Sequence, residues 1–232
     1  MPIPLKQAIK IGAYVMRQKL KGRERYPLVL MLEPLFRCNL ECIGCGKIQK
    51  PNEILNKNLT IAQCLNAAKE CGAPVVSIAG GEPLMHPEIV EIVEGLIKQK
   101  RYIYLCTNAL LLKNFFGKLP ISPFLTLSIH LDGLEDDHDR IVDQKGVFKI
   151  AVESVREAKK MGYRVTSATT FFEGTTIEQA ETFLDFLNPL GIDGVTLSSA
   201  FRYPDAPDQD HFFGRKRTQE FFKELLEKNK KG

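Results

Sequence analysis

The sequence predicts an α/β fold in which six parallel strands alternate with helices and curl into a partial (βα)6 TIM-like barrel, preceded by an amphipathic helix. From Pro27 onward, short strand-like runs alternate with longer segments of helical periodicity. This alternation predicts a parallel sheet with helices outside it. The first run, Leu28–Leu35, is apolar at nearly every position, as in strands buried on both faces. Right-handed crossovers then favour an incomplete barrel over scattered strands.

The elements follow in a regular order, and Thr60 is a suitable N-cap for the first helix of the barrel. We expect strands at 28–35, 74–79, 102–107, 124–131, 163–171 and 194–198. We expect helices at 60–71, 87–100, 146–161, 176–190 and 215–230, with a short helix near 109–117. In such sheets, functional residues lie in loops at the C-terminal ends of the strands.

Residues 4–21 have the pattern of an amphipathic helix, because Leu5, Ile9, Gly12/Ala13, Met16 and Leu20 recur at helical spacing. The other positions are largely basic, and residues 1–26 have a net charge of +6. Two interpretations follow from this pattern. The helix packs on the rest of the protein with a solvated outer face, or it lies on an anionic membrane surface.

The composition is that of a globular protein of one or at most two domains, with 44% hydrophobic residues in 232. No apolar run reaches the ~18–20 residues that span a bilayer, and the N-terminal segment is too charged for a secretory signal. We therefore expect a cytoplasmic protein. Outside residues 1–26 the net charge is −2, which argues against a nucleic-acid partner.

A cysteine motif of the form CxxxCxxC, made of Cys38, Cys42 and Cys45, directly follows the first strand. Three thiolates on a short loop can hold three corners of a [4Fe–4S] cluster. The fourth iron is then free to chelate the amino and carboxylate groups of a methionine moiety. The alternatives are a zinc site, which usually takes four protein ligands, and a simple electron carrier. For zinc, Cys64 and Cys71 are poor fourth ligands because they fall within a predicted helix.

A cysteine motif at this place in a (βα)6 array resembles that of the radical S-adenosylmethionine (SAM) superfamily. Gly80, Gly81 and Glu82, at the end of the second strand, resemble the motif with which that superfamily binds the methionine amino group. Standing alone, two glycines more often mark a turn. The resemblance implies a [4Fe–4S] cluster and SAM as cofactors. Gly44, before the third cysteine, departs from the aromatic residue common there.

Side chains that alternate on the fourth strand form a further group of candidates. Ser128, His130 and Asp132 point to one face, and we expect Ser128 and His130 to bind the cosubstrate or substrate if that face is the barrel lumen. The alternative is a buried polar layer whose groups satisfy one another.

A longer resemblance is to the adenosyl-hopene transferases of hopanoid biosynthesis. It rests on residues 26–38, 44–48, 71–84 and 104–112, together with the stretches HLDG at 130–133 and APDQ at 206–209. It implies a transferase that cleaves SAM and adds the 5′-deoxyadenosyl radical to the terminal alkene of a hopene (diploptene), forming adenosylhopane. The implied partners are a triterpene, an electron donor such as flavodoxin or ferredoxin, and the inner face of the cytoplasmic membrane.

Radical addition leaves a tertiary carbon radical that must be reduced. Cys106 ends the third strand at the expected catalytic edge, and we hypothesise that its thiol quenches this radical. The alternative is a small buried residue that packs the strand end.

Other functions remain open at this point. The runner-up function is hydrogen abstraction from a peptide or small metabolite by another type of radical SAM enzyme, and a non-enzymatic cluster module is a further alternative. We expect three regions: the helix in 1–26, the barrel in 27–200, and in 201–232 the start of a C-terminal extension that longer relatives continue.

Overall fold

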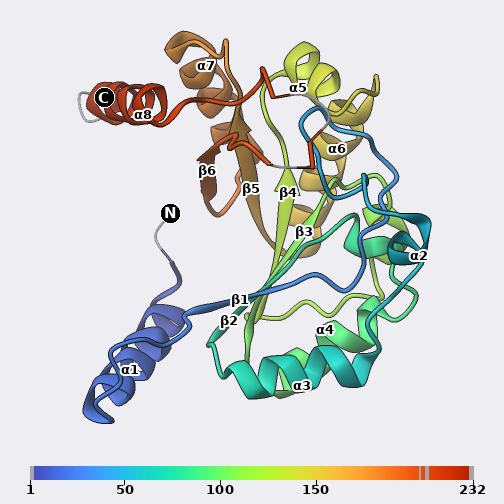
Figure 1. The fold of residues 1–232 in the computed structure, drawn as a ribbon, viewed down its shortest axis with the longest axis vertical. Helices are drawn as coiled ribbons and strands as arrows, with labels where there is room; N and C mark the ends of the chain where they lie inside the picture. Colours follow the sequence, from blue (N-terminus) through green and yellow to red (C-terminus); the bar gives the residue numbers. More distant parts are fainter. Residues whose placement is uncertain (1–2, 204, 207–208, 230–232) are drawn as a thin grey trace.

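The computed structural model describes residues 3–203, 205–206 and 209–229, and it has the predicted partial-barrel architecture. Six strands form one sheet in chain order, and all neighbouring strands are parallel. The strands are β1 (Val29–Leu32), β2 (Val75–Ile78), β3 (Tyr102–Thr107), β4 (Leu125–His130), β5 (Arg164–Phe171) and β6 (Val195–Ser199). Figure 1 shows the curled sheet with the helices that follow its strands on the outer side.

The helices agree with the sequence pattern except at three places. The long helices are α1 (Leu5–Leu20), α3 (Ile61–Cys71), α4 (Ile89–Lys98), α6 (Val147–Met161), α7 (Ile177–Leu187) and α8 (Arg215–Asn229). The short helix expected near 109–117 is instead a 3₁₀ turn, η2 (Leu112–Phe115). Two short helices, α2 (Asn52–Leu55) and α5 (Glu135–Ile141), escaped prediction because neither has an apolar stripe or a side-chain N-cap. Two further 3₁₀ turns are η1 (Pro83–Met85) and η3 (Asn188–Leu190).

The main core lies between the sheet and the outer helices. Ile92 and Leu96 of α4 belong to the same buried cluster as Ile103 and Leu105 of β3, and all four are fully buried. Burying such a side chain stabilises the fold by about 1.5–3 kcal/mol. Thr60 caps α3 as predicted, because its hydroxyl accepts from the backbone N–H of Gln63 in a capping box. These contacts fix the outer layer and leave the inner face of the barrel for function.

Strand β1 is shorter than predicted and lies at an open edge of the sheet. The chain leaves the sheet after Leu32, so the apolar run to Leu35 is not one strand buried on both faces. Met31 pairs with Ser77 in the register, and the Ser77 hydroxyl contacts the Cys106 thiol. Paired residues of parallel strands point to the same face, so Met31 also faces the barrel interior. It is 61% exposed there.

Helix α1 turns its polar side to the barrel and its apolar stripe outward. Its buried residues are Gln7 and Gln18, whereas the stripe residues Leu5, Ile9, Met16 and Leu20 are exposed. The helix therefore packs on the barrel, as one interpretation expected, but through the side that carries Gln7 and Gln18 and not through its apolar stripe. Within the described part of the chain, no helix is both long and apolar enough to cross a membrane.

The C-terminal helix α8 covers the β5 side of the barrel. Phe221 and Leu225 of α8 form a buried cluster with Phe171 of β5 and Ile177 of α7. Tyr203 and Phe212, between β6 and α8, lie against Gly46 and Gly44 of the cysteine loop. The division into residues 1–26, 27–200 and 201–232 stays a prediction.

Candidate active site

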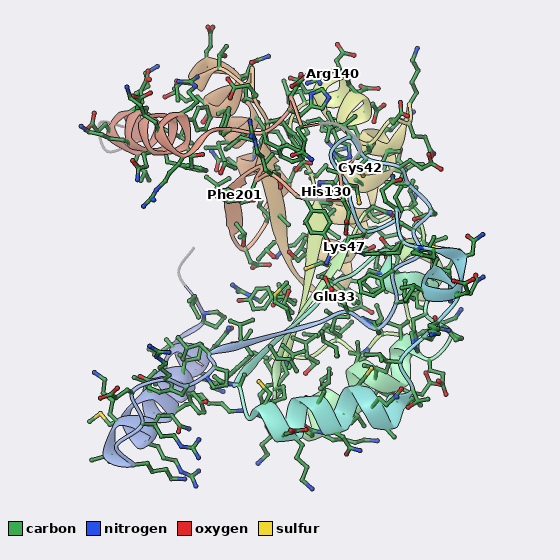
Figure 2. The ribbon with its side chains drawn as sticks, viewed as in Figure 1. Glu33, Cys42, Lys47, His130, Arg140 and Phe201 are labelled. Carbon is green, nitrogen blue, oxygen red and sulfur yellow. The ribbon has the colours of Figure 1, made fainter. Side chains whose placement is uncertain are left out.

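The three cysteines of the loop after β1 line one pocket of about 410 Å³ at the carboxyl edge of the sheet. Cys38, Cys42 and Cys45 are each partly buried and free of disulfides. The backbone N–H of Ile43 donates to the carbonyl of Ile141 at 2.8 Å and so ties the loop to the end of α5. The same pocket contains every other predicted site residue: Gly80, Gly81, Glu82, Cys106, Ser128 and His130. Figure 2 shows Cys42 and His130 at this edge.

The two glycines after β2 are required by the backbone of the cysteine loop. A Cβ on Gly81 would lie 2.0 Å from the carbonyl oxygen of Arg37, and one on Gly80 would lie 2.3 Å from that of Leu35. Gly80 also has a positive φ of 108°, a conformation that favours glycine. The N–H of Gly81 donates to Leu35 at 3.1 Å. These glycines therefore hold the turn against the cysteine loop while they line the pocket.

Glu82 is buried at the pocket wall and accepts three hydrogen bonds. Its Oε1 accepts from the backbone N–H of Leu84 at 3.0 Å and from the hydroxyl of Thr107 at 2.8 Å. Its Oε2 accepts from the backbone N–H of Asn108 at 2.8 Å. Burial nevertheless holds the pKa of Glu82 above its usual value, and the hydrogen bonds oppose that rise. A cation in the pocket would favour the ionised form.

Asn108 is a site residue that sequence reasoning missed. Its side-chain amide donates to Oδ1 of Asn39 at 2.8 Å and points to Sγ of Cys38 at 3.9 Å. Its own Oδ1 accepts from the backbone N–H of Leu110 at 3.1 Å. Asn108 thus joins the end of β3 to the cysteine loop. The sequence feature that could have predicted it is the polar pair Thr107–Asn108 at the carboxyl end of a strand.

Cys106 lies on β3 with its thiol toward the barrel interior. Its Sγ is 3.6 Å from the hydroxyl of Ser77 on one neighbouring strand, and Ser128 is its register partner on the other. Burial raises the pKa of Cys106, although these two hydroxyls oppose the rise. The thiol consequently keeps its hydrogen at neutral pH.

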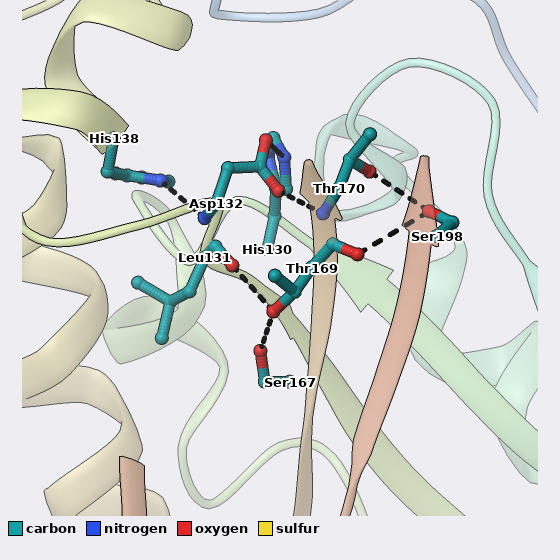
Figure 3. A network of polar contacts seen from close by, with 8 residues as sticks. All are labelled: His130, Leu131, Asp132, His138, Ser167, Thr169, Thr170 and Ser198. Atoms are coloured by element: carbon teal, nitrogen blue, oxygen red, sulfur yellow. Dashed lines mark hydrogen bonds and ion pairs between the residues drawn. The ribbon is translucent and has the colours of Figure 1, made fainter. Parts of the chain in front are cut away.

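The end of β4 carries a polar network that Figure 3 shows in detail. Nε2 of His130 pairs with Oδ2 of Asp132, and Oδ1 of Asp132 accepts from the backbone N–H of Thr170 at 2.7 Å. Burial alone would lower the pKa of His130, but the charge and hydrogen bond of Asp132 outweigh it and raise the pKa. Ser128 and His130 line the pocket, whereas Asp132 lies behind His130 and holds its ring.

His138 of α5 supports this network and was also missed. Its Nδ1 accepts from the backbone N–H of Asp132 at 3.2 Å, and its ring lies 5.6 Å from that of His130. Burial, followed by the charge of His130, lowers the pKa of His138 to about 4. The pair therefore divides into His130, which favours the charged form, and His138, which stays neutral.

The donor set fits an iron–sulfur cluster. Burial raises the pKa of Cys38 to about 11 and that of Cys42 further still, so the thiols without a cation are neutral. A bound metal centre would displace these protons. Among the described residues, no three His, Cys, Asp or Glu side chains converge on a single metal ion. A [4Fe–4S] cluster instead takes each thiolate on a different iron, which suits three separate thiols around one pocket.

The segment after β6 fits closely onto the glycines of the cysteine loop. A Cβ on Gly46 would lie 1.9 Å from the ring of Tyr203, and one on Gly44 would lie 2.9 Å from the ring of Phe212. Gly44 also has a positive φ of 70°. Lys50 forms an ion pair with Asp205 along the same contact. Position 44 thus has a glycine in place of the aromatic residue common in the superfamily, and the ring of Phe212 from the C-terminal segment packs against this glycine.

Comparison with known proteins gives one family match and several named relatives. The model of the radical SAM superfamily matches residues 32–187. A probable GTP 3′,8-cyclase of Methanococcus maripaludis is 24% identical over 221 residues, covering 90% of this chain and 73% of that enzyme. The GTP 3′,8-cyclase of Petrotoga mobilis is 28% identical over 156 residues, covering 64% of this chain and 48% of that enzyme.

Solved structures share the fold at low identity. Streptococcus suis SuiB superposes with a TM-score of 0.72 at 20% identity, covering 97% of this chain and 52% of SuiB. The structure of anSMEcpe with bound AdoMet and a peptide superposes with a TM-score of 0.67 at 17% identity, covering 87% and 59% of the two chains. The chain therefore spans about half the length of SuiB and of the Petrotoga enzyme.

Proposed function

This chain belongs to the radical SAM superfamily, and on that premise we propose that it transfers the 5′-deoxyadenosyl group of SAM to the terminal alkene of a hopene. The product would be adenosylhopane, a precursor of extended hopanoids. The more general statement, that the chain is a radical SAM enzyme whose cofactors are a [4Fe–4S] cluster and SAM, follows from family membership. The alkene acceptor is the proposal.

The residues that would hold the cofactors are those that line the pocket. Cys38, Cys42 and Cys45 would bind the cluster, and the wall formed by Gly80–Glu82, Ser128 and His130 would contact SAM. When bound there, the cluster would supply the one-electron reduction of SAM, with a flavodoxin or ferredoxin as electron donor, that yields the 5′-deoxyadenosyl radical. Glu82, ionised beside a cationic amino group, would orient the methionine moiety, and the Asp132–His130 pair would fix the opposite wall.

The observation that carries the proposal is the protonated thiol of Cys106 in the same pocket as the three cluster cysteines. Addition of the radical to the alkene forms the C5′–C bond and leaves a tertiary carbon radical. In the proposed step, Cys106 donates its S–H hydrogen atom to that carbon and becomes a thiyl radical. One further electron from the reductant and one proton restore the thiol. An enzyme that abstracts hydrogen instead leaves the radical on its substrate and releases 5′-deoxyadenosine, so the nucleoside product distinguishes the two reactions.

The charges around the pocket suit an apolar acceptor. Its lining contains no lysine or arginine among the described residues, and nearby Lys47 is held in an ion pair with Glu33. Val29 and Met31 of β1 leave further apolar side chains exposed. Hopenes partition into bilayers, so the proposed enzyme works as a peripheral protein at the inner face of the cytoplasmic membrane.

Hydrogen abstraction from another substrate is the second candidate function, because the named curated relatives are GTP 3′,8-cyclases. A triphosphate, however, is normally bound by Arg or Lys. The test is anaerobic incubation of reconstituted protein with dithionite, SAM and either diploptene or GTP, followed by mass spectrometry. Adenosylhopane supports the proposal. Conversion of GTP with no adenosylated lipid would replace it with the second function.

A further inference from the structure

Helix α1 is fixed to the barrel by polar contacts along one side. The side-chain amide of Gln7 donates to the hydroxyl of Tyr104 at 3.3 Å, and the hydroxyl of Tyr14 donates to the carbonyl of Pro27 at 2.9 Å. The ammonium of Lys10 donates to the carbonyl of Lys100 and lies 5.2 Å from the ring centre of Tyr102. These contacts come from three successive turns, so they set which side of α1 faces outward.

The outward side of α1 is a stripe of exposed apolar residues. Leu5, Ile9, Met16 and Leu20 are 75%, 61%, 68% and 85% exposed. At 3.6 residues per turn these four side chains fall within an arc of about 60°. Gln7 and Gln18, the buried residues of the helix, lie on the opposite side. A surface helix normally buries its apolar stripe, so this one has its stripe free for a partner outside the chain.

Basic residues flank the stripe. Lys6 and Arg17 lie on one side of it and Lys19 on the other, at helical angles that leave the stripe between them. The sixteen residues of α1 include no aspartate or glutamate. Lys21, Arg23 and Arg25 follow directly in the chain. An apolar stripe between cationic edges matches a surface with an apolar interior and anionic headgroups.

We propose that the stripe of α1, Leu5, Ile9, Met16 and Leu20, inserts into the interface of an anionic bilayer while its basic edges contact the lipid headgroups. The charges argue against a second copy of this chain as the occupant, because pairing two such helices would bring their cations together. The membrane site deepens the proposed function and rests on it for the identity of the lipid substrate. Leu28, Val29 and Met31, which follow α1 in the chain, are further exposed apolar residues.

Vesicle co-sedimentation tests the proposal on the whole chain with its cluster reconstituted. The probes are vesicles of phosphatidylcholine alone and of phosphatidylcholine with phosphatidylglycerol. The apolar variant is Leu5→Gln/Met16→Gln/Leu20→Gln, which keeps good helix formers at exposed positions. The charge variant is Lys6→Gln/Arg17→Gln/Lys19→Gln. The control variant, Ile121→Gln/Met161→Gln/Leu226→Gln, removes three exposed apolar side chains elsewhere.

We expect the native chain and the control variant to bind the anionic vesicles, and each α1 variant to lose at least about tenfold in binding. Raised salt should weaken the native binding, because the headgroup contacts are screened. No binding by the native chain, or equal binding by the apolar variant, would overturn the proposal. A dimer in sedimentation velocity that only the apolar variant loses, without vesicle binding, would overturn it in favour of self-association.

Adenosyl transfer to detergent-solubilised diploptene, measured on the same variants, keeps the two proposals separate. The substituted residues of α1 lie outside the active-site pocket. We therefore expect equal transfer in detergent by the native chain and all three variants. Vesicle binding without any transfer would refute the proposed reaction and leave the membrane site standing.

Discussion

The Sγ of Cys106 and the Oγ of Ser77 lie 3.6 Å apart across two neighbouring strands, on the inner wall of the barrel. The Cys106 thiol, which is neutral, therefore lies in the same pocket as Cys38, Cys42 and Cys45. Because burial raises its pKa, this sulfur has a transferable hydrogen rather than a negative charge. In the proposed reaction that hydrogen goes to the product radical.

Cys106→Ser should therefore separate SAM cleavage from product formation. An O–H bond is too strong to donate a hydrogen atom to a tertiary carbon radical, so we expect adenosylhopane to fall at least about tenfold while SAM consumption continues. Lipid mass spectrometry and chromatography of the nucleoside products measure the two outcomes. The matched control is Ser77→Ala, which keeps the thiol. Undiminished adenosylhopane from Cys106→Ser, with no added thiol, would show that another donor quenches the radical.

The three loop cysteines should differ sharply from the remaining ones in iron binding. Replacing Cys38, Cys42 or Cys45 by Ala leaves one iron without its thiolate, so we expect loss of bound iron and of the visible absorption of the cluster. Cys71→Ala is the control, because Cys71 lies in α3 and outside the pocket. Iron content unchanged in a loop variant, or lost equally in Cys71→Ala, would contradict the ligand assignment.

His138 should make the fold sensitive to acid. Its pKa is lowered to about 4 in the folded chain, against about 6.5 when unfolded. As pH falls below 6.5 the unfolded state takes up the proton first, so the free energy of unfolding falls, by about 1 kcal/mol between pH 7 and 5.5. His138→Asn keeps an acceptor for Asp132 but cannot titrate.

The measurement is urea unfolding of the native chain and His138→Asn at several pH values, under argon. The stability of the variant should decline less on acidification, by about the amount assigned to His138. Parallel pH profiles would mean that His138 does not carry this sensitivity.

The contact between Gly46 and Tyr203 should couple the cysteine loop to the C-terminal segment. Gly46→Ala puts a methyl group where the Tyr203 ring lies, and we expect a loss of about 1–3 kcal/mol in the free energy of unfolding. Adding Tyr203→Ala should remove part of that loss, so that the two substitutions are not additive. Gly12→Ala is the contrast, because nothing lies within 4 Å of its Cβ position, and alanine favours a helix. Strict additivity at Gly46 and Tyr203 would contradict the coupling.

The sequence pattern predicted those parts of the molecule that depend on local periodicity or on a known motif. The parallel strands, their order and the helices with strong stripes follow from apolar spacing. The carboxyl ends of parallel strands share one edge of the sheet. The cysteine loop, the Gly80–Glu82 turn and Cys106 could therefore be expected to line one pocket. That arrangement is observed, and the chemical roles of these residues stay predictions.

The parts that escaped prediction depend on contacts between distant segments. Asn108 could not be predicted because its amide donates to the side chain of Asn39, which is 69 residues away in the chain. Gly44 looked like a missing aromatic residue, but its space is filled by Phe212 from the C-terminal segment. In α1, periodicity located the apolar stripe correctly and left its direction open, because the direction depends on what Gln7 and Tyr14 contact in the barrel.

Adduct formation from isotopically labelled SAM gives the sharpest test of the proposed reaction. The reconstituted chain is incubated anaerobically with dithionite, diploptene and SAM deuterated at both C5′ positions, and the lipid fraction is analysed by mass spectrometry. Radical addition forms the C5′–C bond without breaking a C5′–H bond, so adenosylhopane should retain both deuterium atoms. Labelled 5′-deoxyadenosine that gains a hydrogen from diploptene, with no adenosylated lipid, would contradict the proposal.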